Sequence, residues 1–363
     1  MLDKIKECLS FKKKNCLDFF IKVNLDYKKI LKSKFNDYLA SINTNYSETI
    51  IGEIEKLNYR KIDDFLEFPT ISNIIFNEKN WDDEINFSNV YKGLKAEVAF
   101  LENNFDLSRS ENYLWTSDGS YLTYFDGKKF KQFISPKIGN SIPVDNYSPS
   151  YFSFTPEAIN EYEDVFVDYE IEDLLDQVNV INESYDRLPK NHKIFIEIYI
   201  KSFMLKKLVG KSKKTISSCS DGDYIGRIAF VNSHKMSDWF IMESLIHEAI
   251  HGFIFQLNKT TKFITTYVKN DLNFKSPWTG NSLTLYNLIE AIHVWYAIYQ
   301  YHIDFGISEF DEKVSNERTN WLKKGFEKLD LKSGRIKNSV QSTFLDYLLV
   351  YKKEIIENEH KIA

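Results

Sequence analysis

The sequence predicts an α+β fold that is mainly helical, in which a metal-binding helix packs on a second ligand helix beside a small antiparallel sheet. Three observations lead to this expectation. Apolar residues recur at helical spacing over most of the 363-residue chain, an aromatic and β-branched stretch at 113–133 alternates like strands, and the peptide SLIHEAIHGFIF at 244–255 carries two histidines four residues apart. A chain of this length can bury a large core.

Composition limits the partners and the location of the protein. Its 43% hydrophobic and 27% charged residues are typical of a soluble globular chain. The net charge of -5, with both signs interspersed, predicts neither nucleic acid nor a membrane surface as a partner. Lysines interrupt every apolar run near the N-terminus, and Cys8, Cys16 and Cys219 are too few and scattered for a disulfide framework. We therefore expect a cytoplasmic protein with reduced thiols.

The chain divides into three predicted parts. Residues 1–135 should form an N-terminal, mostly helical region that ends in β-hairpins, with Asp-Gly pairs at 118–119 and 126–127 in the turns. Residues 136–155 are rich in Pro, Gly, Asn and Ser, which predicts a loop or linker. Residues 156–363 should form the metal-binding catalytic domain.

Local signals place the elements of the third part. Thr155-Pro156-Glu157 predicts the start of a helix, and residues 224–232 read as a strand. Ser237 is a plausible N-cap for an amphipathic helix that contains the two histidines. A second strong helix is expected over 283–302, and Gly334 separates two further amphipathic helices.

The pattern HEAIH has the geometry of a metal site. Residues four apart lie on one face of a helix, so His247 and His251 can direct ring nitrogens at one ion. Glu248 lies about 100° round the helix from His247, close enough to reach a ligand or water on that ion. The alternative is a pair of core histidines beside a salt-bridged glutamate, which would be costly to bury without a ligand.

A third protein ligand is expected from another element. The segment LIEAIHVWYA offers Glu290 and His293, which are three residues apart on neighbouring sides of the second helix. Either side chain could reach the ion, and the residues alone do not choose between them.

Three segments together resemble a known family. HEAIH is followed by Ser276-Pro277-Trp278 and then by AIHVWYA at 291–297, which is similar to the α-ketoglutarate-HExxH-type peptide β-hydroxylases associated with ribosomally made, modified peptides. The resemblance covers about residues 232–301. Relatives usually continue Pro-Trp with an arginine, whereas Thr279 stands here.

This resemblance implies an Fe(II) and 2-oxoglutarate-dependent enzyme that hydroxylates a precursor peptide. It implies His247, His251 and His293 as metal ligands and Glu248 as the motif glutamate. The far carboxylate of 2-oxoglutarate would need a cation, ideally an arginine. Our first candidate is Arg227, followed by Lys275 and Arg335.

Two other function classes stay open. In a zincin-like metallopeptidase, Zn²⁺ would be held by His247, His251 and either Glu290 or His293, and Glu248 would be the general base on a zinc-bound water. The strand at 224–232 would then be an edge strand that pairs with an extended peptide. The third class is a non-enzymatic scaffold of a peptide-maturation complex that keeps a relic of the motif.

Overall fold

The computed structural model describes residues 1–12, 16–105, 113–125, 129–154, 165–209, 216–269, 272–306 and 311–357. It is mainly helical with small sheets, as predicted. The helices are α1 (Leu2–Leu9), α2 (Cys16–Ser41), α3 (Thr44–Ile54), α4 (Tyr59–Glu67), α5 (Pro69–Phe76), α6 (Glu84–Glu102), α7 (Pro149–Phe152), α8 (Ile171–Arg187), α9 (Lys190–Tyr199), α10 (Asp238–Thr261), α11 (Phe263–Tyr267), α12 (Leu285–Tyr301), α14 (Glu312–Lys328), α15 (Gly334–Ser339) and α16 (Ser342–Glu357). The strands are β1 (Tyr113–Trp115), β2 (Tyr121–Phe125), β3 (Lys129–Phe133), β4 (Lys137–Ile138), β5 (Ile142–Pro143), β6 (Val165–Val167), β7 (Ser202–Val209), β8 (Ser217–Ser220), β9 (Arg227–Val231), β10 (Asn273–Lys275) and β11 (Ser282–Thr284).

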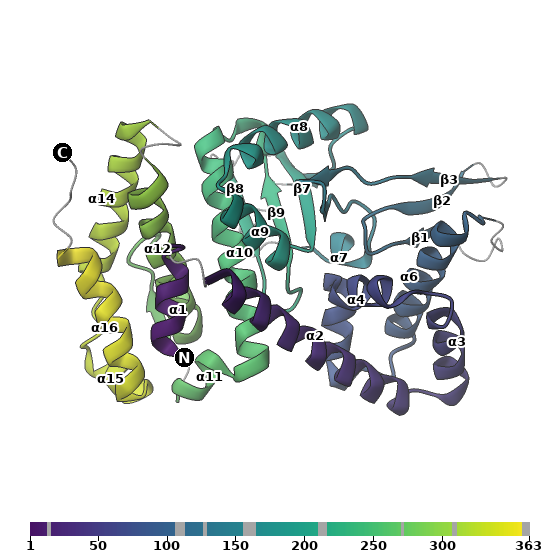
Figure 1. The fold of residues 1–363 in the computed structure, drawn as a ribbon, viewed down its shortest axis with the longest axis horizontal. Coiled ribbons are helices and arrows are strands. Elements are labelled where there is room, and N and C mark those ends of the chain that lie inside the picture. The colour runs from purple at the N-terminus through teal and green to yellow at the C-terminus, as the bar shows by residue number, and fades with distance from the viewer. Residues whose placement is uncertain are drawn as a thin grey trace.

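The long helix α2 runs from the middle of the molecule to one end. Helices α14 to α16 lie at one end and α3 to α6 with β1 to β3 at the other, and α2 extends from beside α10 to α3 (Figure 1). Its first half contributes Phe20 and Val23 to the core that contains α10 and α12, whereas its second half contributes Leu31 and Phe35 to the core of α3 to α6. Helix α2 is therefore shared between both cores.

The segments predicted as hairpins and linker are both ordered parts of the fold. Strands β1, β2 and β3 form an antiparallel sheet, as expected, although the Asp-Gly turn at 126–127 lies outside the described residues. In the segment predicted as a linker, β4 pairs with β5 and α7 follows. Ile138, Ile142 and Val144 of this segment are buried in the main core, so it packs as part of the domain.

The four-stranded sheet beside α10 has the order β6-β7-β9-β8. Strands β7 and β9 are parallel, and β6 and β8 are antiparallel to their neighbours, so this sheet is mixed, beside the small antiparallel sheets that were predicted. The strand predicted at 224–232 is β9. It lies between β7 and β8, so the prediction that it is an edge strand is wrong, and β8 occupies that edge.

Helix α10 is the central element of the main core. Ser237 has the extended backbone of an N-cap, although its side chain makes no cap hydrogen bond, and the helix ends at Lys262 in a left-handed conformation. It contacts α2, α8, α9, α11, α12 and β8. Because most of its faces are covered, even its glutamates Glu243 and Glu248 are buried. The predicted helix start at Thr155-Pro156-Glu157 lies outside the described residues.

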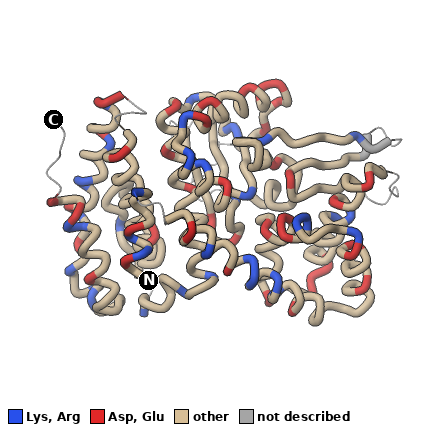
Figure 2. The backbone as a smooth tube through the Cα atoms, viewed as in Figure 1, with Lys and Arg blue, Asp and Glu red and all other residues tan. Residues whose placement is uncertain are grey.

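Helix α12, the predicted second ligand helix, packs against α10 and begins at the capping side chain of Thr284. Gly334 opens the short helix α15, between the two longer C-terminal helices. Lys and Arg are interspersed with Asp and Glu along the chain in Figure 2. Within the described residues, no helix has the length and apolar character needed to cross a membrane.

The close approach of α10 to α9 requires a glycine at position 252. A Cβ there would lie 2.8 Å from the backbone oxygen of Tyr199, the last residue of α9. We expect Gly252→Ala to lower the free energy of unfolding by about 1–3 kcal/mol, measured by urea denaturation. Gly52→Ala is the matched control, because no heavy atom lies within 4 Å of the added Cβ on α3. That variant should be at least as stable as the wild type, and equal losses in both would contradict the packing of α10 on α9.

Candidate metal centre

His247 and His251 lie one helical turn apart on α10 and face each other through their Nε2 atoms. The two nitrogens are 3.2 Å apart. At a metal–nitrogen distance of about 2.1 Å, two ligand nitrogens are about 3.0 Å apart in octahedral and about 3.4 Å apart in tetrahedral geometry. The observed separation lies between these values, so one ion could bind both rings without moving the helix.

Glu290 of α12 fixes the orientation of His251. Its carboxylate contacts Nδ1 of the ring, the nitrogen that faces away from His247. A carboxylate can only accept at neutral pH, so Nδ1 carries the proton and Nε2 keeps a free lone pair. This is the arrangement in which a carboxylate holds the tautomer of a metal-binding histidine. Glu290, one of the two predicted third ligands, therefore lies at the pair as an orienting group.

The two histidines differ in their affinity for protons. Burial, together with the neighbouring His251, lowers the pKa of His247 well below its usual value. Burial also disfavours a proton on His251, but the charge and hydrogen bond of Glu290 outweigh it and raise the pKa of that ring. His247 is therefore neutral at pH 7, as a metal ligand must be, and a metal ion would compete with a proton for His251.

Glu248 completes the group. One of its carboxylate oxygens and the donor atoms of His247 and His251 all lie within 4.8 Å of one another, and its side chain is buried. The hydroxyl of Ser220 on β8 donates a 2.6 Å hydrogen bond to Oε2 of Glu248. The structure thus brings together three of the predicted site residues and adds a serine that the sequence did not indicate.

His293, the third ligand implied by the resemblance, lies elsewhere. Its ring is fully buried among Phe263, Phe344, Tyr347 and Tyr351, and its Nδ1 donates to the backbone oxygen of Ile289 at 2.7 Å. Three residues along a helix correspond to about 300°, so His293 points about 60° away from Glu290. Among the described residues, the group that could share one ion does not include His293, so this structure places the ring in the aromatic core, outside the histidine pair.

The three predicted cations for a 2-oxo acid are not gathered at the histidines. Arg227 is buried on β9, where its guanidinium pairs with Asp221 and donates to the backbone oxygen of Ser150 at 2.7 Å. Arg335 donates to the backbone of β10 and lies over the Phe274 ring, and Lys275 is exposed on the same strand. In the described part of the chain, none of the three makes a hydrogen bond, ion pair or ring contact with His247, His251 or Glu248.

A second polar group lies one turn before His247 and was missed in the sequence. Glu243 is buried and accepts hydrogen bonds from His302 at 2.7 Å and from Arg318 at 2.8 and 3.0 Å. The Arg318 guanidinium lies over the rings of Trp295 and Trp321, and Trp295 packs against His247 with ring centroids 4.7 Å apart. The spacing of four residues between Glu243 and His247 places both on one face of α10, and this spacing could have indicated the group from the sequence.

Comparison with known proteins assigns no family. No protein-family model matches the chain, and none of the curated proteins is similar to it. Residue geometry is therefore the basis for a functional assignment.

Measurements of metal binding by variants should distinguish the roles of the side chains on α10 from those on α12. We expect His247→Ala and His251→Ala to abolish zinc binding, and Glu290→Gln to weaken it by about 10–100-fold, because the orienting hydrogen bond is lost. His293→Phe should bind one zinc ion as the wild type does, since that ring packs among aromatic side chains. Zinc titration with elemental analysis provides the measurement. A folded His293→Phe protein that binds no metal would restore His293 as a ligand.

Because Glu243 is buried and paired, we expect the free energy of unfolding of the protein to depend on pH in the acid range. Burial alone would raise its pKa, but the His302 hydrogen bond and the Arg318 charge outweigh burial and lower the pKa from 4.5 to about 2. A lowered folded-state pKa contributes stability above the unfolded value, and this contribution is lost between pH 4.5 and 2.

Glu243→Gln should therefore have a free energy of unfolding about 3 kcal/mol lower than that of the wild type at pH 7. This difference, the gap in stability, should narrow as the pH falls below about 4.5, and urea unfolding at several pH values measures it. The control is Glu183→Gln, because Glu183 is exposed on α8. A gap for Glu243→Gln that stays constant down to pH 2 would contradict the assignment.

Proposed function

We propose that this protein is a zinc-dependent hydrolase of peptides, with the ion held by His247 and His251 and with Glu248 as the acid–base group. The observation that carries the proposal is the contact between Glu248 and Ser220. It connects the helix of the histidine pair to β8, the edge strand of the mixed sheet. The ligands, the base and a strand that can bind an extended peptide thus belong to one cluster.

The chemistry follows from the positions of the side chains. A bound zinc ion would supply Lewis acidity and make a water molecule easier to deprotonate. Glu248 is adjacent to the pair without contacting the imidazole nitrogens directly, so its carboxylate is placed to take a proton from such a water and pass it to the leaving amine. Because Ser220 donates to Oε2 only, Oε1 remains available for this proton transfer.

Strand β8 is suited to bind the substrate backbone. It pairs with β9 on one side only, and its residues Ser217–Ser220 are exposed or half-buried. The backbone N–H and C=O groups on the outer side of an edge strand are the usual template for an added peptide strand. A HExxH helix packed beside such a strand also supports a zincin-like arrangement.

The peptide hydroxylase remains a second candidate because of one observation. Trp278 of the Pro-Trp segment is buried, and its ring centroid lies 6.3 Å from that of Trp295, which packs on His247. Trp295 therefore lies between the Pro-Trp segment and the histidine pair. Against this candidate, Arg227 is engaged by Asp221, and His293 lies away from the pair.

A cleavage assay tests the proposal. The zinc-loaded protein should cleave members of a quenched-fluorescence peptide library without added 2-oxoglutarate. Glu248→Gln should keep its zinc but lose about 10²–10⁴-fold in kcat/KM, because the base is removed. Ser220→Ala should lower activity less, and Ser217→Ala, at the exposed start of β8, is the matched control.

The same wild-type and variant proteins also test the second candidate function, the peptide hydroxylase. Loaded with Fe(II) and supplied with 2-oxoglutarate and a peptide, a hydroxylase would form succinate and a product heavier by one oxygen. Succinate formation without peptide cleavage would overturn the hydrolase proposal and support the hydroxylase.

A further inference from the structure

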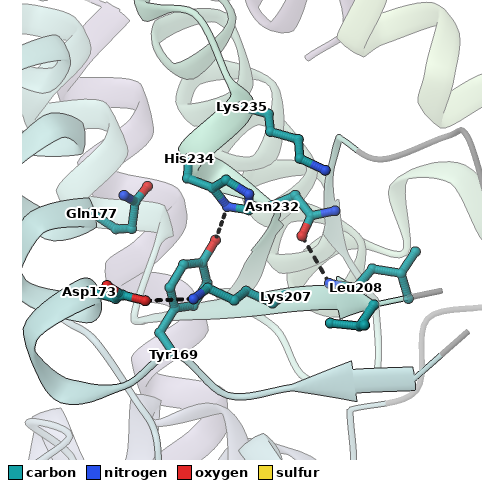
Figure 3. Close-up of a pocket in the computed structure, with 9 residues that line it drawn as sticks. Tyr169, Asp173, Gln177, Lys207, Leu208, Asn232, His234 and Lys235 are labelled. Atoms are coloured by element: carbon teal, nitrogen blue, oxygen red, sulfur yellow. Dashed lines mark hydrogen bonds and ion pairs between the residues drawn. The ribbon is translucent and has the colours of Figure 1, made fainter.

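A cavity of about 550 Å³ opens at the carboxyl ends of the parallel strands β7 and β9, separate from the histidine pair (Figure 3). Its walls come from the end of β7, from the connection between β9 and α10, from α8, and from Tyr169, which lies two residues before α8. In open sheets, ligands commonly bind outside the carboxyl ends of parallel strands. The volume is in the range of small-molecule sites.

Asn232 supplies the most informative group in this cavity. The backbone N–H of Leu208 donates to Oδ1 of Asn232 at 2.9 Å. An N–H can only donate, so this contact fixes which end of the amide is oxygen and turns Nδ2 away from Leu208. Asn232 is 1% exposed, and its Nδ2 makes no hydrogen bond within the described part of the chain. A buried amide donor without an acceptor is unfavourable, which points to a ligand oxygen.

The backbone holds Asn232 in place. It adopts a left-handed conformation with φ of 55°, its N–H donates to the oxygen of Lys206, and its oxygen accepts from the N–H of Lys235. The free Nδ2 is therefore a fixed donor, in the same turn that carries Lys235.

The charges around Nδ2 of Asn232 indicate which kind of ligand oxygen the cavity would bind. Lys207 is balanced by Asp173, with Nζ and Oδ2 2.7 Å apart, whereas Lys235 has no ion pair within the described residues. His234 contacts the Tyr169 hydroxyl through Nδ1, and burial together with Lys235 and Lys207 lowers its pKa, so it is neutral at pH 7. The cavity thus carries one unbalanced positive charge in a chain whose net charge is -5.

We infer that this cavity binds a small organic carboxylate, with one oxygen accepting from Nδ2 of Asn232 and the other facing Nζ of Lys235. A monoanion with two oxygens matches one amide donor and one unbalanced cation. A phosphate dianion would exceed that charge and would meet Asp173. Leu208 and Val209 at the end of β7 and the Tyr169 ring provide apolar wall for the rest of the ligand. The source is either a free acid or the C-terminus of a peptide.

Binding of N-acetyl-L-leucine to the full-length protein tests this inference, with the side-chain amide signal of Asn232 in ¹⁵N NMR spectra as the direct readout. The signal should shift on titration, and N-acetyl-L-leucinamide, which lacks the charge, should bind at least about tenfold more weakly. Inorganic phosphate should be the weaker anion. A peptide that ends in leucine, compared with its C-terminal amide, shows whether the site also accepts a peptide end.

Two variants and two controls complete the experiment. Lys235→Gln should weaken acid binding about tenfold or more, whereas Lys324→Gln, which removes an exposed charge on α14, should not. Asn232→Asp keeps the acceptor for Leu208 but replaces the donor, and should abolish binding. Because the inference is independent of the metal centre, His247→Ala should bind the acid normally. Equal affinity for acid and amide, stronger binding of phosphate, or an unchanged Lys235→Gln would overturn it.

Discussion

The burial of α10 is the constraint on which the surrounding structure depends. This helix carries Glu243, His247, Glu248 and His251 within nine positions, and a buried ionisable group is stable only with a partner. The partners come from different elements, so each contact also fixes the position of an element: Arg318 of α14 at Glu243, Ser220 of β8 at Glu248, and Glu290 of α12 at His251. The polar requirements of one helix thus determine how two helices and an edge strand are arranged around it.

The sequence predicted this helix and its partner helix because both are long and strongly periodic. It could not choose between Glu290 and His293, since a rotation of about 60° separates a residue that faces α10 from one that faces α16. Strand β8 was not predicted because SSCS has no apolar alternation, and its place at the sheet edge depends on the crossover between β7 and β9. The ion pair of Arg227 with Asp221 likewise depends on a contact that composition does not reveal.

The proposed hydrolase and the inferred carboxylate site use different parts of one structural unit. Strand β9 leads through Asn232 into the turn before α10, and α10 then carries the histidine pair. A ligand oxygen in the cavity would contact the start of that unit, and a peptide on β8 would lie near its middle. The cavity and the histidine pair share a scaffold, yet their polar groups form separate clusters.

The long-range contacts of α1 have a consequence for biogenesis. Near the N-terminus, Lys6 pairs with Glu354 of α16 and Lys12 with Asp304 just after α12, so contacts span about 300 residues of sequence. Contacts of such separation form late, because a long loop must close first. During synthesis the first half of α2 can pack on α9 and α10 once these helices exist, whereas α1 has no such partner until α12 and α16 have been made. The apolar face of α1 is therefore exposed for most of the time in which these residues are synthesised.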